Sequence, residues 1–171
     1  NAVGDPAVIC SEIGDDHVFV ETKAAYAKEM ATGFIRLNGM TVGVVGNRTE
    51  SYDEDGNVAE KYADVLTARG ARKAAKFVKF CDAFEIPVLT LTNVNGFKAT
   101  VCGEKMMAKS VGALVHAFAD ATVPKVNVVI GKAFGTAYTA MNSKAIGADM
   151  VYAWENAEIG MMDADLAAKI M

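Results

Sequence analysis

The segment that most constrains the fold is residues 123–141, where an apolar strand sequence runs into a glycine turn and then into small residues. Residues 125–130 are typical of a buried strand, and Gly135-Thr-Ala-Tyr-Thr-Ala140 predicts a helix that begins at the turn and continues to about Ile146. The N–H groups of a first helical turn have no partner inside the helix, and the helix dipole is positive there. The pattern therefore indicates a site where backbone amides hold a phosphate, a carboxylate or a developing oxyanion.

The rest of the chain predicts alternating strands and helices. Asn38-Gly39 between the apolar runs 34–37 and 40–45 predicts a β-hairpin. This rhythm is typical of an α/β fold with mainly parallel strands, in which ligands bind beyond the carboxyl ends of the strands. The turns at 92–97 and 131–136 are both expected at that edge. We expect helices over 64–84, 104–121 and from Asp163 onward, strands over 86–91, 125–130, 150–153 and 157–159, an acidic lead-in over 1–22 and a polar loop over 46–62.

The composition excludes several classes of function. A net charge of −4 argues against nucleic acid or an anionic membrane as the main partner, and no uncharged apolar run reaches the ~20 residues of a transmembrane helix. Cys10, Cys81 and Cys102 are too widely spaced for a disulfide framework or a zinc site. Free thiols predict a reducing, cytoplasmic compartment. His17 and His116 have no visible metal-binding partners, so no metal is expected.

Five blocks of sequence stand out: GMTVGVVGN (39–47), GARKAAKFVKFCDAFEIP (70–87), AFADATVPK (117–125), KAFGTAYTAM (132–141) and GADMVYAWENAE (147–158). Taken together, these blocks are similar to the β-subunit family of biotin-dependent acyl-CoA carboxyltransferases, which includes propionyl-CoA carboxylase, transcarboxylase and the biotin-dependent decarboxylases. The resemblance covers almost the whole chain in the family's order. It implies an α/β, crotonase-like (ClpP/crotonase) spiral of ββα units. It also implies that residues 1–171 are the biotin-facing, C-terminal domain, and we expect a fragment of a longer chain.

The resemblance implies carboxyl transfer between carboxybiotin and an acyl-CoA of the propionyl or acetyl type. Carried over by position, the catalytic residues are Gly135, Thr136 and Ala137, and the N–H groups of Thr136 and Ala137 stabilise the negative charge on the ureido oxygen of biotin. No protein base is required. Biotin is carried on a partner protein or domain. The resemblance further assigns biotin contacts to Phe134, Tyr138, Gly96 and Phe97, and an acyl contact to Thr139.

Four features of the chain depart from the family pattern, and one of them, Thr139, leaves the acyl group open. Thr136 stands where a second glycine is usual, and Thr139 stands where propionyl-type enzymes have an acidic residue. Residues 93–97 (Asn-Val-Asn-Gly-Phe) replace the usual Asp-x-Pro-Gly-Phe, and Glu155 replaces a proline. The first two departures motivate an alternative activity, the biotin-dependent decarboxylation of a malonyl- or glutaconyl-type CoA thioester.

Other interpretations stay open at this point. A non-catalytic docking or oligomerisation fragment is a further alternative, because the acyl-CoA-binding half of the family is not among these residues. The expected partners are an acyl-CoA, a biotin carboxyl carrier and further copies of the chain in a dimer-based ring. The turn at Gly135 is also compatible with close helix–strand packing, and Tyr138 with plain packing. The basic cluster at 69–79 is compatible with CoA phosphates or with a solvated helix face.

Overall fold

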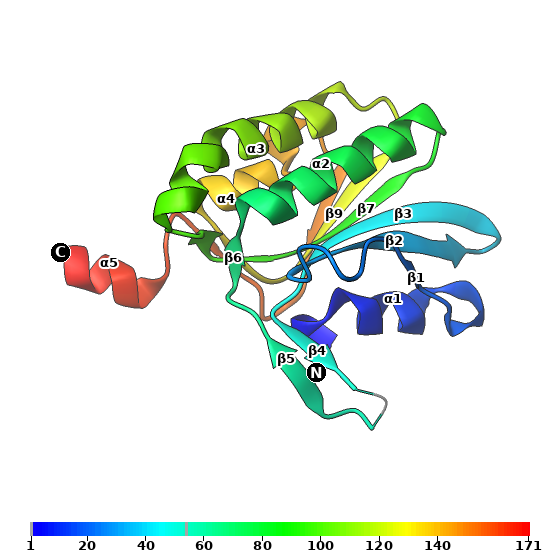
Figure 1. Ribbon diagram of the computed structural model, residues 1–171, viewed down its shortest axis with the longest axis horizontal. Coiled ribbons are helices and arrows are strands. Elements are labelled where there is room, and N and C mark those ends of the chain that lie inside the picture. The colour runs from blue at the N-terminus through cyan, green and yellow to red at the C-terminus, as the bar shows by residue number, and fades with distance from the viewer. Residues whose placement is uncertain (1, 54) are drawn as a thin grey trace.

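The computed structural model describes residues 2–53 and 55–171. Strands and helices alternate along most of the chain, as the sequence predicts (Figure 1). The helices are α1 (Pro6–Ile13), α2 (Ala68–Ala83), α3 (Val101–Asp120), α4 (Gly135–Ala140) and α5 (Ala164–Ile170). The strands are β1 (Val20–Glu21), β2 (Met30–Leu37), β3 (Met40–Asn47), β4 (Glu50–Tyr52), β5 (Val58–Lys61), β6 (Val65–Leu66), β7 (Val88–Val94), β8 (Gly96–Phe97), β9 (Lys125–Phe134), β10 (Met150–Ala153) and β11 (Glu158–Gly160).

The main sheet has the strand order β1-β2-β3-β7-β9-β10, and β11 also pairs with β9. The β2–β3 hairpin is antiparallel, and its turn holds Asn38 and Gly39 at φ of 51° and 83°, which confirms the hairpin predicted from Asn-Gly. The pairs β3–β7, β7–β9, β9–β10 and β9–β11 are parallel. The carboxyl ends of β3, β7 and β9 therefore meet at one edge of the sheet, as expected.

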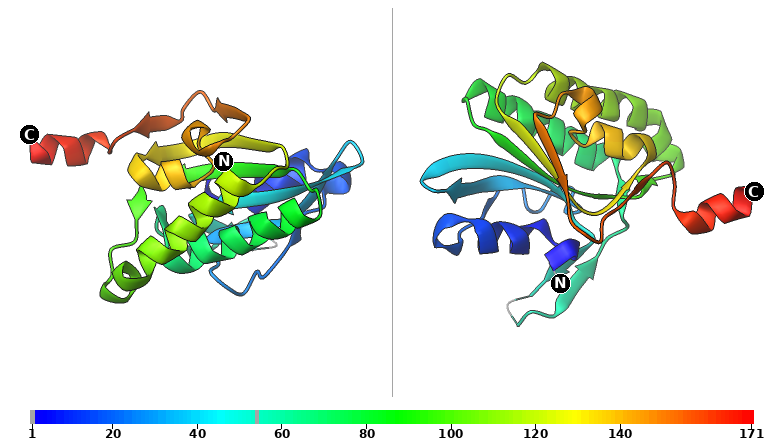
Figure 2. Two further views of the ribbon diagram at one scale, coloured as in Figure 1. Left: turned by 90° about the horizontal axis from the view of Figure 1, so that it is seen from above. Right: turned by 180° about the vertical axis from the view of Figure 1, so that it is seen from behind.

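Helices cover both faces of this sheet (Figure 1). α2 and α3 pack on one face, and α1 packs on the other against β2 and β3. Successive residues of β3 alternate between the two cores: Val42 and Val44 face α1, whereas Val45 faces α2. Two smaller pairs, β4–β5 and β6–β8, lie outside the main sheet. α5 extends away from the body of the molecule (Figure 2).

The core requires a very close approach between α2 and β3. A Cβ atom on Gly43 would lie 2.5 Å from the Sγ atom of Cys81 and 3.2 Å from the ring of Phe77. Cys81 is fully buried, and burial raises the pKa of its thiol to about 12, so it behaves as a small apolar side chain. Glycine at position 43 therefore sets the distance between helix and sheet.

A buried ion cluster lies where β3 ends. The guanidinium of Arg48 donates through Nε to Asp5 at 2.8 Å, and two bonds of 3.0 Å go to the carboxylate of Glu21. Arg48 is only 6% exposed. Because a buried charge is costly unless it is paired, this cluster fixes the residues before α1 and the end of β1 against the sheet.

Lys73 is a second buried cation in the same region. It is 2% exposed, and its Nζ atom donates to the carbonyl of Ala27 at 3.4 Å. Burial lowers the pKa of Lys73 to about 8, because the loss of hydration disfavours the charged amine. The positive charge of Arg48 also lowers this pKa, and the attraction of Glu21, which raises it, is too weak to compensate.

Five predictions about the elements were wrong in extent or kind. The helix expected over 64–84 begins at Ala68, because Val65–Leu66 form β6. The acidic lead-in contains α1, which begins at the N-cap Asp5. The polar loop over 46–62 contains the β4–β5 hairpin. β9 continues through Gly131 to Phe134, and α4 ends at Ala140 rather than near Ile146. These elements depend on contacts with other parts of the chain, such as pairing to a neighbouring strand. A periodic pattern in a short stretch of sequence does not reveal such contacts.

Replacing Gly43 by Ala is expected to destabilise the fold. The added Cβ would overlap Cys81, and overpacking of this kind costs about 1–3 kcal/mol of the free energy of unfolding. Gly112→Ala is the matched control, because Gly112 lies within α3 with nothing within 4 Å of an added Cβ. The control should gain about 0.5–1 kcal/mol from helix propensity. Urea denaturation measures the free energy of unfolding of both variants. A value for Gly43→Ala equal to that of the unaltered chain would contradict the prediction.

Replacing Lys73 by Met is expected to change how stability depends on pH. The pKa of Lys73 is about 8 in the folded chain against an ordinary value of 10.5. Between these values the unfolded chain holds a proton that the folded chain lacks, so Lys73 makes the free energy of unfolding rise with pH by up to about 1.4 kcal/mol per unit. The unaltered chain should therefore gain stability relative to Lys73→Met across this interval.

Denaturation series at successive pH values measure this difference. Lys76→Met, an exposed position on the same helix, serves as the control and should follow the unaltered chain at every pH. A constant difference in the free energy of unfolding between Lys73→Met and the unaltered chain would contradict the assignment.

Candidate functional site

The glycine turn predicted from the sequence lies at the carboxyl end of β9. Gly135 has φ of +58°, a conformation that favours glycine, and an added Cβ would lie 3.1 Å from the carbonyl oxygen of Met161. Phe134 precedes it as the N-cap of α4 and makes no side-chain capping hydrogen bond. The first-turn N–H groups of α4 therefore have neither an intrahelical partner nor a side-chain cap.

Within α4 the predicted catalytic residues differ in exposure. Thr136 is exposed, whereas Ala137 is 1% exposed and belongs to the main core. The hydroxyl of Thr139 donates to the carbonyl of Gly135 at 3.4 Å, and Ser143 donates to the carbonyl of Thr139 at 2.9 Å. Side-chain hydroxyls thus bind the carbonyls of this short helix, while its leading amides stay uncapped.

β8 brings the second predicted turn next to α4. α4 packs against β8, and β8 itself pairs with β6, so that Gly96 lies opposite Val65. A Cβ atom on Gly96 would meet nothing within 4 Å, which means that open space adjoins this backbone. The structure therefore places Gly96, Phe97 and residues 134–139 in one neighbourhood, although the sequence separates them by almost 40 residues.

The aromatic residues of this neighbourhood are more buried than a contact surface requires. Phe134 is 5% exposed, and Phe97 and Tyr138 pack against the main core. Burial raises the pKa of Tyr138 above its ordinary value, so the phenol is neutral at physiological pH. The three residues support the turn, and their contact with biotin stays a prediction.

The amide of Asn93 joins the two strand ends. Its Oδ1 atom accepts a hydrogen bond from the N–H of Lys132 at 3.0 Å, and its Nδ2 atom donates to the carbonyl of Val3 at 3.4 Å. An amide can donate and accept at once, which a carboxylate cannot do. Lys132 is bound to Asp64 at 2.9 Å, and this hydrogen bond raises the pKa of Lys132. Lys132 is thus a structural cation.

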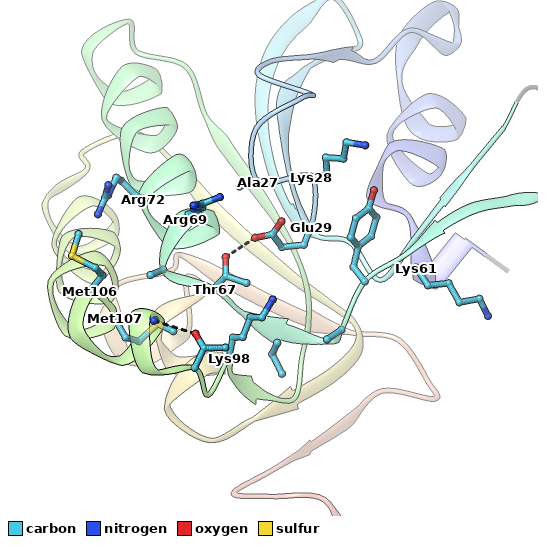
Figure 3. Close-up of a pocket in the computed structure, with 16 residues that line it drawn as sticks. Ala27, Lys28, Glu29, Lys61, Thr67, Arg69, Arg72, Lys98, Met106 and Met107 are labelled. Carbon is cyan, nitrogen blue, oxygen red and sulfur yellow. Dashed lines mark hydrogen bonds between the residues drawn. The ribbon is translucent and has the colours of Figure 1, made fainter.

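Two cavities lie close to this neighbourhood. The larger has a volume of about 820 Å³ and lies between the beginnings of α2 and α3 (Figure 3). The smaller has a volume of about 490 Å³ and includes Asn93, Gly131 and Lys132. Residues 134–139 line neither cavity, as far as the described residues outline them. The larger cavity was not predicted from the sequence, although Arg69 and Arg72 in the basic cluster gave a signal for it.

Residues 2–53 and 55–171 contain no group of three or more His, Cys, Asp or Glu side chains placed to hold a metal ion. Cys10 and Cys81 are free and buried, and the side chain of Cys102 lies outside the description. None of the described helices is long and apolar enough to cross a membrane.

Solved structures with this architecture confirm the predicted α/β, crotonase-like fold. The crystal structure of transcarboxylase 12S, described as a hexamer assembly with hydrolysed methylmalonyl-coenzyme A bound, matches with a TM-score of 0.86 and 38% identity, covering 97% of this chain and 30% of that chain. The β subunit of geranyl-CoA carboxylase from P. aeruginosa matches with a TM-score of 0.80 and 27% identity, covering 92% of this chain and 28% of that chain.

Sequence comparison gives the same result. The putative propionyl-CoA carboxylase beta chain of Bacillus subtilis is 43% identical over 168 residues, which are 98% of this chain and 31% of that protein. The methylmalonyl-CoA carboxyltransferase 12S subunit of Propionibacterium freudenreichii is 39% identical over 164 residues, 95% of this chain and 29% of that protein. The chain thus spans less than a third of the length of these relatives. Because a family model for the carboxyl transferase domain matches residues 1–171, the chain belongs to the carboxyl transferase domain family.

Proposed function

We propose that residues 1–171 are the biotin-facing, C-terminal domain of a biotin-dependent acyl-CoA carboxyltransferase. The activity is the transfer of a carboxyl group between biotin and a propionyl- or acetyl-type CoA thioester. One observation carries the proposal. In a chain of this family, the Gly135 turn at φ of +58° leads into a helix whose first-turn amides are uncapped.

Two features of this neighbourhood support a site for the biotin ring. Open space adjoins the backbone of Gly96, and the uncapped amides of Thr136 and Ala137 lie on the helix that packs against β8. Biotin, carried on a partner protein or domain, supplies or accepts the carboxyl group. A ureido oxygen needs hydrogen-bond donors rather than a charged side chain, and backbone amides meet that need.

The protein's own role in this proposal is to hold negative charge. The N–H groups of Thr136 and Ala137 donate to the oxygen on which charge develops, and Gly135 aims them by its left-handed conformation. The neutral phenol of Tyr138 is the one titratable side chain of α4, and its raised pKa makes it unable to act as a base at physiological pH. No side chain of α4 is therefore assigned to proton transfer, and in this proposal the proton moves between biotin and the thioester.

Decarboxylation is the second candidate activity, and Thr139 favours it. Threonine has no carboxylate to present to an acyl group, whereas the propionyl-type enzymes that the chain resembles have an acidic residue at this position. The hydroxyl of Thr139 donates to the carbonyl of Gly135. A domain with this arrangement would release the carboxyl group of a malonyl- or glutaconyl-type CoA thioester as CO₂ through biotin.

Self-association and a carrier protein complete the proposal. The C-terminal segment exposes Met150, Tyr152, Trp154, Met161 and Ile170, which is a large apolar surface for a chain in isolation. A dimer-based ring would cover such a surface, and the related transcarboxylase 12S is described as a hexamer assembly. The free thiols of Cys10 and Cys81 support a cytoplasmic location.

Carboxyl exchange by the complete polypeptide that carries these residues tests the proposed function. With free biotin, methylmalonyl-CoA or malonyl-CoA should lose its carboxyl group in a biotin-dependent reaction, and the preferred thioester names the substrate. Retention of the carboxyl group on an acceptor indicates transfer, whereas net release of CO₂ indicates decarboxylation. No reaction from a folded, oligomeric protein would leave a docking module as the better interpretation.

Thr136→Pro is expected to lower the rate of that exchange about 10²- to 10³-fold, because proline lacks the N–H group while its φ angle suits a first helical turn. Thr136→Ala keeps the N–H group and should retain most of the activity. Thermal unfolding of both variants checks that the fold is intact. Equal activity of the two variants would show that this amide does not stabilise the transition state.

A further inference from the structure

Polar side chains lie on the face of the sheet against which α4 packs, inside the main core. Thr90 and Thr92 on β7, Asn127 on β9 and Asn142 just after α4 are each 0% exposed. The two threonines share a face of β7 with Val88, which belongs to the main core. Asparagine is disfavoured inside strands, and a buried polar group lowers stability unless it is hydrogen-bonded. Packing alone therefore does not explain these four side chains.

The four side chains form two hydrogen-bonded pairs, and both pairs reach the end of α4. The hydroxyl of Thr92 donates to Oδ1 of Asn127 at 2.8 Å, and Nδ2 of Asn127 donates to the carbonyl of Met141 at 3.1 Å. Nδ2 of Asn142 donates to the hydroxyl oxygen of Thr90 at 3.2 Å. Met141 is the C-cap of α4, and Asn142 is the next residue. Both β7 and β9 are thus bonded to the residues at which α4 ends.

The carbonyl of Met141 determines how the amide of Asn127 lies. A carbonyl only accepts hydrogen bonds, so Asn127 turns its Nδ2 atom toward Met141 and its Oδ1 atom toward Thr92, whose hydroxyl donates. Without this hydroxyl, Oδ1 would be a buried acceptor that has lost its donor, and the amide would no longer be held in one orientation. Thr92 therefore acts on the end of α4 through Asn127.

Asn142 keeps an arrangement that stability alone does not favour. Its φ angle of +55° lies in the left-handed region, which is uncommon for residues other than glycine. Among the described residues, its Oδ1 atom is buried without a hydrogen-bond partner. A buried acceptor without a donor lowers stability, and such violations of local rules are expected at functional sites.

α4 has too few residues to maintain its own geometry. It comprises the six residues Gly135–Ala140, whereas isolated helices shorter than ~12–15 residues are marginal in water. Ala137 and Ala140 pack in the main core and hold α4 against the sheet, but apolar contacts have no preferred direction. Hydrogen bonds do have a preferred direction. The bonds to Met141 and Asn142 therefore set the orientation of α4 on the sheet.

We propose that Thr92, Asn127 and Asn142 are positioning residues for carboxyl transfer. They hold α4 in the orientation in which the N–H groups of Thr136 and Ala137 reach the ureido oxygen of biotin. The inference rests on the proposed function, which assigns these N–H groups to that oxygen, and it adds side chains that touch no ligand. Misplacing a catalytic group by about 1 Å can lower a rate on the order of 10²-fold, so a small movement of α4 is sufficient to reduce the rate.

Two substitutions of Thr92 in the complete polypeptide separate a positioning role from a packing role. Thr92→Val keeps the shape of the side chain and removes the hydroxyl, whereas Thr92→Ser keeps the hydroxyl and removes a methyl group. Thr92→Val should lower kcat for carboxyl exchange about tenfold at constant KM for the CoA thioester, and Thr92→Ser should keep kcat within about twofold. A packing role predicts the reverse order, with Thr92→Ser the more damaging substitution.

Thr32→Val is the matched control. Thr32 is also 0% exposed, and its hydroxyl donates to the carbonyl of Thr22 at 3.2 Å. It lies on β2, two strands away from β7 in the sheet. Because it loses a buried hydroxyl of the same kind, Thr32→Val should lower the unfolding temperature as Thr92→Val does, but it should leave kcat unchanged.

Amide hydrogen exchange gives a measurement that does not depend on activity. The N–H of Met141 donates to the carbonyl of Tyr138 at 2.9 Å, and protection of hydrogen-bonded amides reports how often this segment opens. Thr92→Val should accelerate amide hydrogen exchange over residues 135–141, whereas Thr92→Ser and Thr32→Val should not.

The inference and the proposed function fail in different ways. Unchanged kcat in Thr92→Val, or unchanged amide hydrogen exchange over residues 135–141, would overturn the inference while the unaltered protein still transfers carboxyl groups. Absence of carboxyl exchange in the unaltered, folded protein would overturn the proposed function, and the inference with it. The activity of the unaltered protein therefore distinguishes the two failures.

Discussion

The buried guanidinium of Arg48 is the interaction on which the rest of the structure depends. Burial opposes its charged form, but hydrogen bonds with Glu21 and Asp5 outweigh this and raise the pKa of Arg48. The backbone N–H of Arg48 donates to the carbonyl of Glu29 at 2.8 Å. The carboxylate of Glu29 in turn accepts from Thr67, the N-cap of α2. One permanent charge thus fixes α1, β1 and the beginning of α2 relative to the end of β3.

Side-chain amides extend this order along the carboxyl edge of the sheet. The N–H of Asn93 donates to Asn47 at 3.3 Å, and the carbonyl of its side chain accepts from Lys132 at 3.0 Å. The ends of β3, β7 and β9 are therefore joined by polar contacts among buried or half-buried residues. Gly135 follows Lys132 by three residues, so the glycine turn directly follows the strand end that these contacts hold.

The sequence was sufficient to predict elements whose cause is local. The Asn38-Gly39 hairpin needs left-handed turn residues, and Asp163 caps α5 by accepting from the N–H of Leu166 at 2.7 Å. Elements whose cause is tertiary were missed. β4 and β5 are too short and polar to predict alone and form by pairing with each other. α4 stops at Ala140 because Asn142 adopts φ of +55° and Ser143 turns back to the helix, and neither feature has a periodic signature.

The two parts of the candidate site differ in the same way. Backbone amides after a glycine turn can be predicted, because a missing hydrogen-bond partner at a helix start follows from the geometry of any helix. An unpaired arginine cannot be predicted, because Arg69 and Lys28 are both basic residues in the sequence, and only the fold decides that Lys28 meets Glu60 while Arg69 meets no carboxylate among the described residues. Charge that the fold leaves uncompensated around a cavity is therefore information that only the structure holds.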